Sequence, residues 1–270
     1  MPPDDPGAAL AALLQLMARL RDPEHGCPWD RAQDFQSIAP YTIEEAYEVR
    51  AAIERGDAHA LRGELGDLLF QVVFLARLAE ERGWFDFAAV AAGVHAKLIG
   101  RHPHLFAAEA TPGSAAEQSR RWEDLKALER AAQALGDASA LADIPLALPA
   151  LMRAGKLGRR AGRVGFDWTE PPAVRVKVIE ELGELDAALG AGGGAADAHV
   201  REEFGDLLFA LANWGRHLGI DPEEALRGAN AKFERRFRRM EASAAQRGAP
   251  LEQLSGAEWE ALWCEAKGEP

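Results

Sequence analysis

The chain has 270 residues, 48% hydrophobic and 27% charged, which is typical of a globular protein with an apolar core and one large or two medium domains. Its formal net charge of −12 argues against a nucleic-acid partner, because an extended nucleic-acid surface needs a basic field. Cys27 and Cys264 form neither a disulfide framework nor a zinc motif, and the longest apolar run is too short to cross a bilayer. We therefore expect a cytoplasmic protein without a membrane partner.

The first half is predicted to be mostly helical, because alanine, leucine, glutamate and arginine dominate its composition. Its second helix is expected to begin after Pro40, with Thr42 as the N-cap and Glu45 at the capping-box position, and to end at Gly56. The prolines and glycine of residues 21–30 predict a loop. Further helices are expected at residues 8–20, 58–82 and 87–101.

The helix after Pro40 is predicted to be amphipathic, with an acidic stripe opposite an apolar arc. The acids are Glu44, Glu45 and Glu48, and the apolar side chains are Ile43, Ala46, Tyr47, Val49 and Ile53.

The next helix, at residues 58–82, differs in kind. Between Leu65 and Leu78 it is apolar almost all round, which predicts a central, buried helix. Glu64 and Asp67 lie on this helix, and acids are costly in a buried position unless they are paired or bound to a metal. This is the strongest physical reason to expect them to be ligands.

A change of composition between residues 107 and 145 indicates the domain boundary. Ala-Glu-Ala-Thr-Pro-Gly-Ser is typical of a linker, and a polar helix is expected after it at about 115–135. We predict domains at residues 8–125 and 140–270, joined by a linker at 126–139.

The second half repeats the acidic pattern of the first, which favours an internal duplication of a helical domain. The halves also differ, since Tyr41 stands where the second half has Lys177. The matching motifs are Glu44-Glu45-x-x-Glu48 with Glu180-Glu181-x-x-Glu184, and Glu64-x-x-Asp67-Leu-Leu-Phe with Glu203-x-x-Asp206-Leu-Leu-Phe.

Acids three residues apart stack on one face of a helix, so two facing helices would present four carboxylates to one point. One such pair alone would suggest a solvated surface, but the ordered repetition favours a site for a hard divalent cation. None of the acids has the histidine three residues later that a ferritin-like di-iron site needs, so we expect magnesium or manganese. The expected ligands are Glu181, Glu184, Glu203 and Asp206, with a second site, whose acids are all intact but which need not be active, at Glu45, Glu48, Glu64 and Asp67.

Three cations and a tryptophan complete the candidate site. Lys177 lies four residues before Glu181, and Lys232 and Arg236 lie on one helix face, which would suit a ligand with several phosphates. Taken alone, these cations would more often be surface charges. Trp263 is either a packing residue or an aromatic ledge for a nucleobase.

These residues closely resemble the two-domain bacterial form of the MazG family of nucleoside triphosphate pyrophosphohydrolases. The resemblance covers nearly the whole chain and is most specific in Gly-Cys-Pro-Trp-Asp, Arg-Gly-Glu-Leu-Gly-Asp-Leu-Leu-Phe, Arg-His-Pro-His, Val-Gly-Phe-Asp-Trp and Ala-Asn-x-Lys-Phe-Glu-Arg-Arg-Phe. It implies an all-α fold of two tandem helical-bundle domains, usually paired in a homodimer. It also implies magnesium-dependent hydrolysis of nucleoside triphosphates, such as ATP, to monophosphate and pyrophosphate, in housecleaning or control of nucleotide pools.

The resemblance assigns metal binding to Glu181, Glu184, Glu203 and Asp206, and places the activity in the second half. It assigns nucleotide contacts to Lys177, Glu180, Lys232, Arg236 and Trp263, and to Glu181 and Asp206. Either Glu180 or a ligating acid would accept the proton of the attacking water.

Two alternatives remain at this level. A metal-dependent nucleotide sensor would not need a complete hydrolytic set of residues. The related all-α phosphoribosyl-ATP and dUTP pyrophosphohydrolases are disfavoured, because the match extends over both repeats.

Overall fold

The computed structural model describes residues 5–106, 114, 117–118, 121–122, 124–125, 139–168, 170–190, 194, 197–248 and 251–268. Within these ranges the regular structure is helical and contains no strand, which confirms the predicted all-α class. No helix in the same part of the chain is long and apolar enough to span a membrane.

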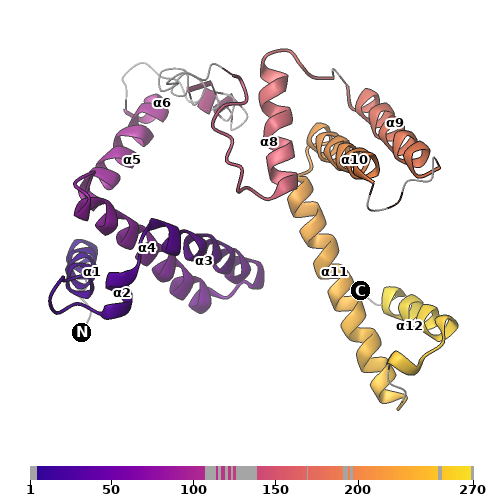
Figure 1. The fold of residues 1–270 in the computed structure, drawn as a ribbon, viewed down its shortest axis with the longest axis horizontal. Coiled ribbons are helices and arrows are strands. Elements are labelled where there is room, and N and C mark those ends of the chain that lie inside the picture. Colours follow the sequence, from indigo (N-terminus) through magenta and orange to yellow (C-terminus); the bar gives the residue numbers. More distant parts are fainter. Residues whose placement is uncertain are drawn as a thin grey trace. The chain divides into compact units, whose positions relative to one another are not determined.

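The chain divides into two compact units, residues 1–130 and 131–270 (Figure 1). The predicted linker at 126–139 lies outside the described residues except for Ser139, as does most of the polar helix predicted at 115–135. Unit one contains α1 (Pro6–Leu20), α2 (Pro28–Ala32), α3 (Phe35–Arg55), α4 (Ala58–Glu81), α5 (Phe87–Arg101) and α6 (Pro103–Phe106). Unit two contains α8 (Ala150–Arg163), α9 (Pro171–Gly190), α10 (Ala198–His217), α11 (Pro222–Gln246), a 3₁₀ turn (Leu251–Gln253) and α12 (Gly256–Gly268).

The start of α3 differs from the prediction. The helix begins at Phe35, because the Asp34 carboxylate accepts the Ser37 N–H at 2.9 Å while the Ser37 hydroxyl accepts the Asp34 N–H. Pro40 lies inside the helix and removes one backbone donor there. The Thr42 hydroxyl therefore does not cap the helix, and instead donates to the Ile38 carbonyl oxygen. The predicted loop at 21–30 also ends earlier than expected, since α2 begins at Pro28.

The end of α3 agrees with the prediction. Gly56 has a φ of 66°, a left-handed conformation that suits glycine, and its N–H caps the helix. Asp57 then accepts backbone N–H groups at the start of α4, so α3 and α4 form a tightly connected antiparallel pair (Figure 1).

The core of unit one lies where α4 crosses α1 and the start of α3. It contains Met17, Ile38, Val73, Phe74 and Leu78, and the Arg21 guanidinium lies over the Phe74 ring. Residues of α1 and α5 pack against Val73, Phe74 and Leu78 in the second half of α4, and α4 as a whole is not the fully buried helix that its sequence predicts. Leu65 and Leu69 are exposed on its first half.

The apolar arc of α3 is similarly uncovered, since Ile43, Tyr47 and Ile53 are all exposed. Helix α5 has no buried residue at all. Unit two repeats this pattern, with Val176 and Ile179 exposed on α9 and Phe204 and Leu208 exposed on α10. Such continuous apolar faces are typical of surfaces that another chain covers.

Replacing Phe74 with alanine should destabilise unit one by about 3–5 kcal/mol, because its ring is fully buried and its removal leaves a cavity. Urea denaturation monitored by circular dichroism would measure the loss. The matched control is Phe106→Ala, at a ring that is 63% exposed, and it should change stability by no more than about 0.5 kcal/mol. Equal effects of the two substitutions would contradict this description of the core.

Candidate active site

Three of the predicted ligands meet between α9 and α10. Glu181 and Glu184 lie one turn apart on α9, and Glu203 faces them from α10, with one carboxylate oxygen of each within 4.8 Å of the others. The two helices can approach in this way because they form an antiparallel pair (Figure 1). The helical spacing and the packing of α9 against α10 therefore bring together three of the four ligands predicted from the sequence.

The environment of this acid cluster is partly buried and strongly negative. Glu181 is only 7% exposed, whereas Glu184 is open to solvent. Partial desolvation and the negative charges of Glu181 and Glu203 raise the pKa of Glu184. A cation placed among these oxygens would relieve the repulsion that raises this pKa.

Lys177 is the cation that already contacts the cluster. Its Nζ lies 2.8 Å from a Glu181 oxygen and 2.9 Å from a Glu180 oxygen, and hydrogen bonds to both carboxylates raise the pKa of the lysine. Lys177 therefore stays protonated beside the acids, as the sequence predicts. The position of Glu180 is also consistent with its predicted role, since it borders the cluster through Lys177.

Asp206 lies near the cluster, but its carboxylate is not among the three whose oxygens converge. It is exposed on α10 and lines a cavity of about 160 Å³ together with Lys177 and Glu181. On the other side, His199 Nδ1 lies 3.3 Å from a Glu203 oxygen. His199 was not among the predicted site residues, although its spacing of four residues from Glu203 places both side chains on the same helix face.

The remaining predicted nucleotide contacts gather elsewhere in unit two. The Arg236 guanidinium lies 5.9 Å from the centre of the Trp263 ring, and Phe233 packs against the same ring at 5.5 Å. Lys232 is exposed one turn away on α11. In Figure 1 the far half of α11 and α12 lie apart from the α9–α10 pair. Among the described residues, no hydrogen bond or ion pair joins Lys232, Arg236 or Trp263 to the acids.

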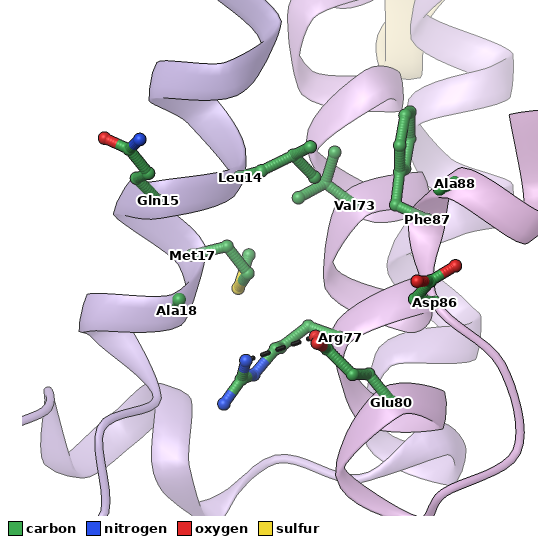
Figure 2. A pocket seen from close by; sticks show the side chains of 10 residues that line it. All are labelled: Leu14, Gln15, Met17, Ala18, Val73, Arg77, Glu80, Asp86, Phe87 and Ala88. Carbon is green, nitrogen blue, oxygen red and sulfur yellow. Dashed lines mark hydrogen bonds and ion pairs between the residues drawn. The ribbon is translucent and has the colours of Figure 1, made fainter.

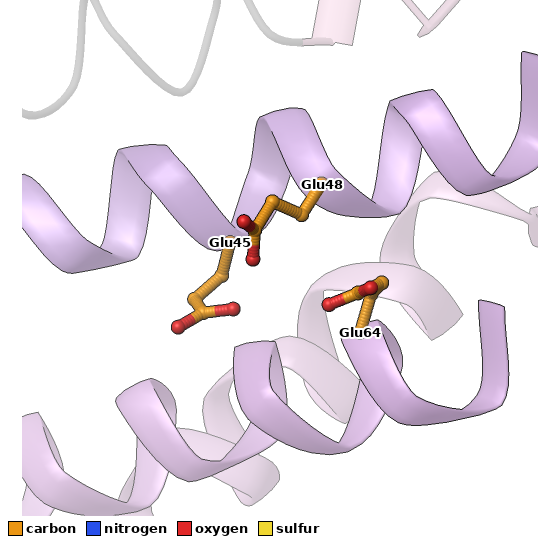
Figure 3. Close-up of side chains that lie close together, drawn as sticks. All are labelled: Glu45, Glu48 and Glu64. Atoms are coloured by element: carbon orange, nitrogen blue, oxygen red, sulfur yellow. The ribbon is translucent and has the colours of Figure 1, made fainter. Parts of the chain in front are cut away.

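Unit one has a corresponding acid cluster on α3 and α4. Oxygens of Glu45, Glu48 and Glu64 lie within 4.8 Å of one another, and the three side chains point toward a common space (Figure 3). Desolvation, followed by the charges of Asp67 and Glu48, raises the pKa of Glu45. Asp67 is thus close to this cluster without being part of the converging set.

The surroundings of that cluster differ from those in unit two. Tyr41, at the position of Lys177, packs edge-on against Trp29 with ring centres 6.5 Å apart, so no lysine reaches the acids from this position. Gln71 Nε2 approaches a Glu45 oxygen at 3.5 Å. A separate cavity of about 320 Å³ lies between α1, α4 and the start of α5 (Figure 2), but none of the predicted site residues lines it.

A second polar network in unit two, which was not predicted from the sequence, joins Asp167, Arg216, His217 and Asn213. Asp167 Oδ1 is 2.5 Å from Arg216 Nη2 and 2.8 Å from His217 Nε2. Burial alone would raise the pKa of Asp167, but hydrogen bonds from Arg216 and His217 outweigh it and lower the pKa. Arg216 also donates a hydrogen bond to Asn213 Oδ1. Asn213 interrupts the apolar run of α10, and this polar residue in an apolar run was the sequence pattern that could have indicated the network.

Comparisons with known proteins identify the family of this chain. The model of the MazG nucleotide pyrophosphohydrolase domain matches residues 33–106, a stretch that includes the unit-one acid cluster. A nucleoside triphosphate pyrophosphohydrolase of Escherichia coli (strain K12) is 51% identical over 94% of this chain and 95% of its own length. The nucleoside triphosphate pyrophosphohydrolase/pyrophosphatase MazG of Thermotoga maritima is 42% identical over 97% of each chain.

A more distant relative, the nucleoside triphosphate pyrophosphohydrolase of Mycolicibacterium smegmatis, is 38% identical over 61% of this chain and 49% of its own length. The Escherichia coli and Thermotoga maritima relatives, by contrast, match over nearly their full lengths, so the similarity includes both acid clusters. The chain therefore belongs to the MazG family of nucleotide pyrophosphohydrolases, enzymes that hydrolyse acid anhydrides.

Proposed function

We propose that unit two hydrolyses nucleoside triphosphates, ATP among them, to a nucleoside monophosphate and pyrophosphate, with magnesium as the cofactor. The observation that carries the proposal is the convergence of Glu181, Glu184 and Glu203 with Lys177 bound at their edge. Anionic oxygens and a lysine side by side suit a cation and the phosphates that accompany it.

The donor set fits Mg²⁺, with Mn²⁺ as the alternative. Three carboxylates converge, Asp206 borders the same cavity, and all four offer the oxygen ligands that these hard cations prefer. When bound, such an ion offsets phosphate charge and makes a coordinated water more acidic. Glu181, Glu184, Glu203 and Asp206 are the residues that would hold it.

The other side chains have roles that follow from their charge. Lys177, Lys232 and Arg236 would neutralise the charge that develops on the departing pyrophosphate. Glu180 or one of the ligating acids would accept the proton of the attacking water. The aromatic ledge predicted at Trp263 would hold the nucleotide beside Arg236.

We also propose that the active form is a homodimer. The acids and Arg236 with Trp263 are held by different parts of unit two, while the apolar faces of α3, α4, α9 and α10 are exposed. A second copy would cover these faces and complete the helical bundles, with residues 8–125 and 140–270 as the two domains.

The cellular role that fits this reaction is the removal of unwanted nucleotides or control of nucleotide pools in the cytoplasm. Unit one keeps the acids but has Tyr41 in place of the lysine, so we propose that it holds a cation without hydrolysing a triphosphate. A sensor role for the whole chain is disfavoured, because unit two keeps Lys177 together with the complete set of acids.

Glu181→Ala or Glu203→Ala should lower pyrophosphate release by at least about 100-fold, because each removes a ligand from the acid cluster. The measurement is pyrophosphate released from each nucleoside triphosphate in the presence of Mg²⁺, with chelator and Mn²⁺ as separate conditions. The matched control is Glu45→Ala in unit one, which should retain most of the activity. Undiminished release by the unit-two variants, or equal loss in the control, would contradict the assignment.

Light scattering should give the mass of a dimer, twice the 29.2 kDa of one chain, because the exposed apolar faces favour pairing. Replacing Leu65 and Val72 with glutamate should shift the mass toward one chain, since charges in an apolar interface stay unpaired. Leu146→Glu is the control, because Leu146 is 84% exposed outside any helix. A wild-type monomer would rule out the proposed dimer.

A further inference from the structure

The acid clusters of the two units differ in the group that lies at their edge. The matched motifs align Glu45 with Glu181 and Tyr41 with Lys177. In unit two the Lys177 ammonium group lies 2.8 Å from a Glu181 oxygen. Among the described residues, no ion pair joins a lysine or an arginine to the unit-one acids. The second copy of the helix pair thus shows that the edge of such a cluster accepts an ammonium group on an alkyl chain.

Gln71 is the side chain that contacts Glu45 in unit one. Its Nε2 approaches a Glu45 oxygen at 3.5 Å, which is the outer limit of a hydrogen bond, and the amide carries no charge. Gln71 is only 7% exposed, and its Oε1 has no hydrogen-bond partner within the described part of the chain. A buried amide oxygen without a donor is unfavourable. The site therefore lacks both a positive charge and a hydrogen-bond donor beside Glu45.

Two half-exposed aromatic rings lie next to these acids. Tyr41 is on the same face of α3 as Glu45 and Glu48, because residues four and seven apart share a helix face. Its ring contacts Trp29 edge-on. Tyr41 is 40% exposed and Trp29 is 52% exposed, so both rings keep open surface for an alkyl chain or a cation.

This combination of groups suits an organic ammonium ion better than a small metal ion. The three converging carboxylates (Figure 3) and the Gln71 oxygen all accept hydrogen bonds, and an ammonium group donates three. Aromatic rings attract ammonium groups and pack against alkyl chains. Mg²⁺, by contrast, is usually held by one or two carboxylates together with substrate phosphates, and unit one has Tyr41 in place of the lysine for phosphates. Three acids are matched best by a ligand with more than one positive charge.

We propose that the unit-one acid cluster binds a polyamine, an alkyl chain with two or more ammonium groups. One ammonium group lies beside Glu45 and Gln71, in the place that Lys177 takes in unit two. The alkyl chain packs against Tyr41 and Trp29. This inference rests on the proposed function, in which unit one holds a cation, and names the class of that cation. The bound polyamine offsets the repulsion between the acids of α3 and α4 and takes no part in hydrolysis.

Calorimetric titration of the full chain with spermidine, in the absence of nucleotide and Mg²⁺, tests the proposal. Tyr41→Lys should weaken spermidine binding by about tenfold or more, because the new lysine provides an internal ammonium group for Glu45. Tyr41→Phe is the matched control, which keeps the aromatic ring and should preserve the affinity. Gln71→Leu should weaken binding by about tenfold, since it removes the buried acceptor at similar side-chain volume.

The location of the site is tested by the same substitution in each cluster. Glu45→Gln should weaken spermidine binding by about tenfold or more, whereas Glu181→Gln at the matching position of unit two should leave it unchanged. Circular dichroism identifies any variant that fails to fold, and each of the three unit-one substitutions tests the site independently.

Equal losses in the two clusters would show non-specific attraction of a polycation to an acidic protein and would overturn the proposal. Affinity that is unchanged by Tyr41→Lys, Gln71→Leu and Glu45→Gln would do the same. A parallel titration with Mg²⁺ separates the two levels of the inference. If unit one binds Mg²⁺ but not spermidine, the polyamine fails and the cation-holding role stands, and if it binds neither, both fail. Pyrophosphate release by unit two is a separate measurement, so failure of the proposed reaction is distinguishable from either result.

Discussion

The mutual repulsion of carboxylates is the constraint on which the rest of this structure depends. Three acids hold oxygens within 4.8 Å of one another in each unit, and each cluster raises the pKa of one of its members. Without a positive charge nearby, the carboxylates repel one another, and the repulsion is stronger where less water reaches them. The helix pairs α3–α4 and α9–α10 must therefore be held in place by packing. A cation between the carboxylates would reduce their repulsion.

That packing is incomplete within each unit taken by itself. Each pair of helices buries one face and leaves another apolar face exposed, so the exposed side chains of α4 and α10 have no counterpart in their own unit. A helix that is apolar all round needs neighbours on every side. In the proposed homodimer, a second copy would supply these neighbours.

The two units share a pair of acid-bearing helices but differ in the side chains beside the acids. Both keep the acids, but Lys177 is replaced by Tyr41, and the open space beside Ala210 and Asn213 is filled by Gln71 and Phe74 in unit one. The first difference removes a positive charge from beside the acids, and the second fills the neighbouring space. Both changes lie next to the acids and leave the acids themselves in place.

Much of the site could be predicted from local spacing alone. Acids three residues apart on a helix share a face in any structure, so the common face of Glu181 and Glu184 followed from the helical repeat. Glu203 joins them because α10 packs against α9. The sequence was less informative where two signals competed. The helix was expected to begin after Pro40, but the capping bonds of Asp34 and Ser37 start it at Phe35. Local capping hydrogen bonds decide where such a helix begins, and a proline only limits the backbone conformations near it.

The sequence by itself determined the helical class, the acid spacing, the position of Lys177 beside Glu181 and the family. Each of these depends on residues close together in the chain or on overall similarity. Only the tertiary structure decided that the first half of α4 is exposed, that Asp206 stands outside the converging set, and that Asp167, Arg216 and Asn213 form one network beside an open cavity. These features depend on which helices touch, and contacts between distant segments are set by packing that no local pattern records.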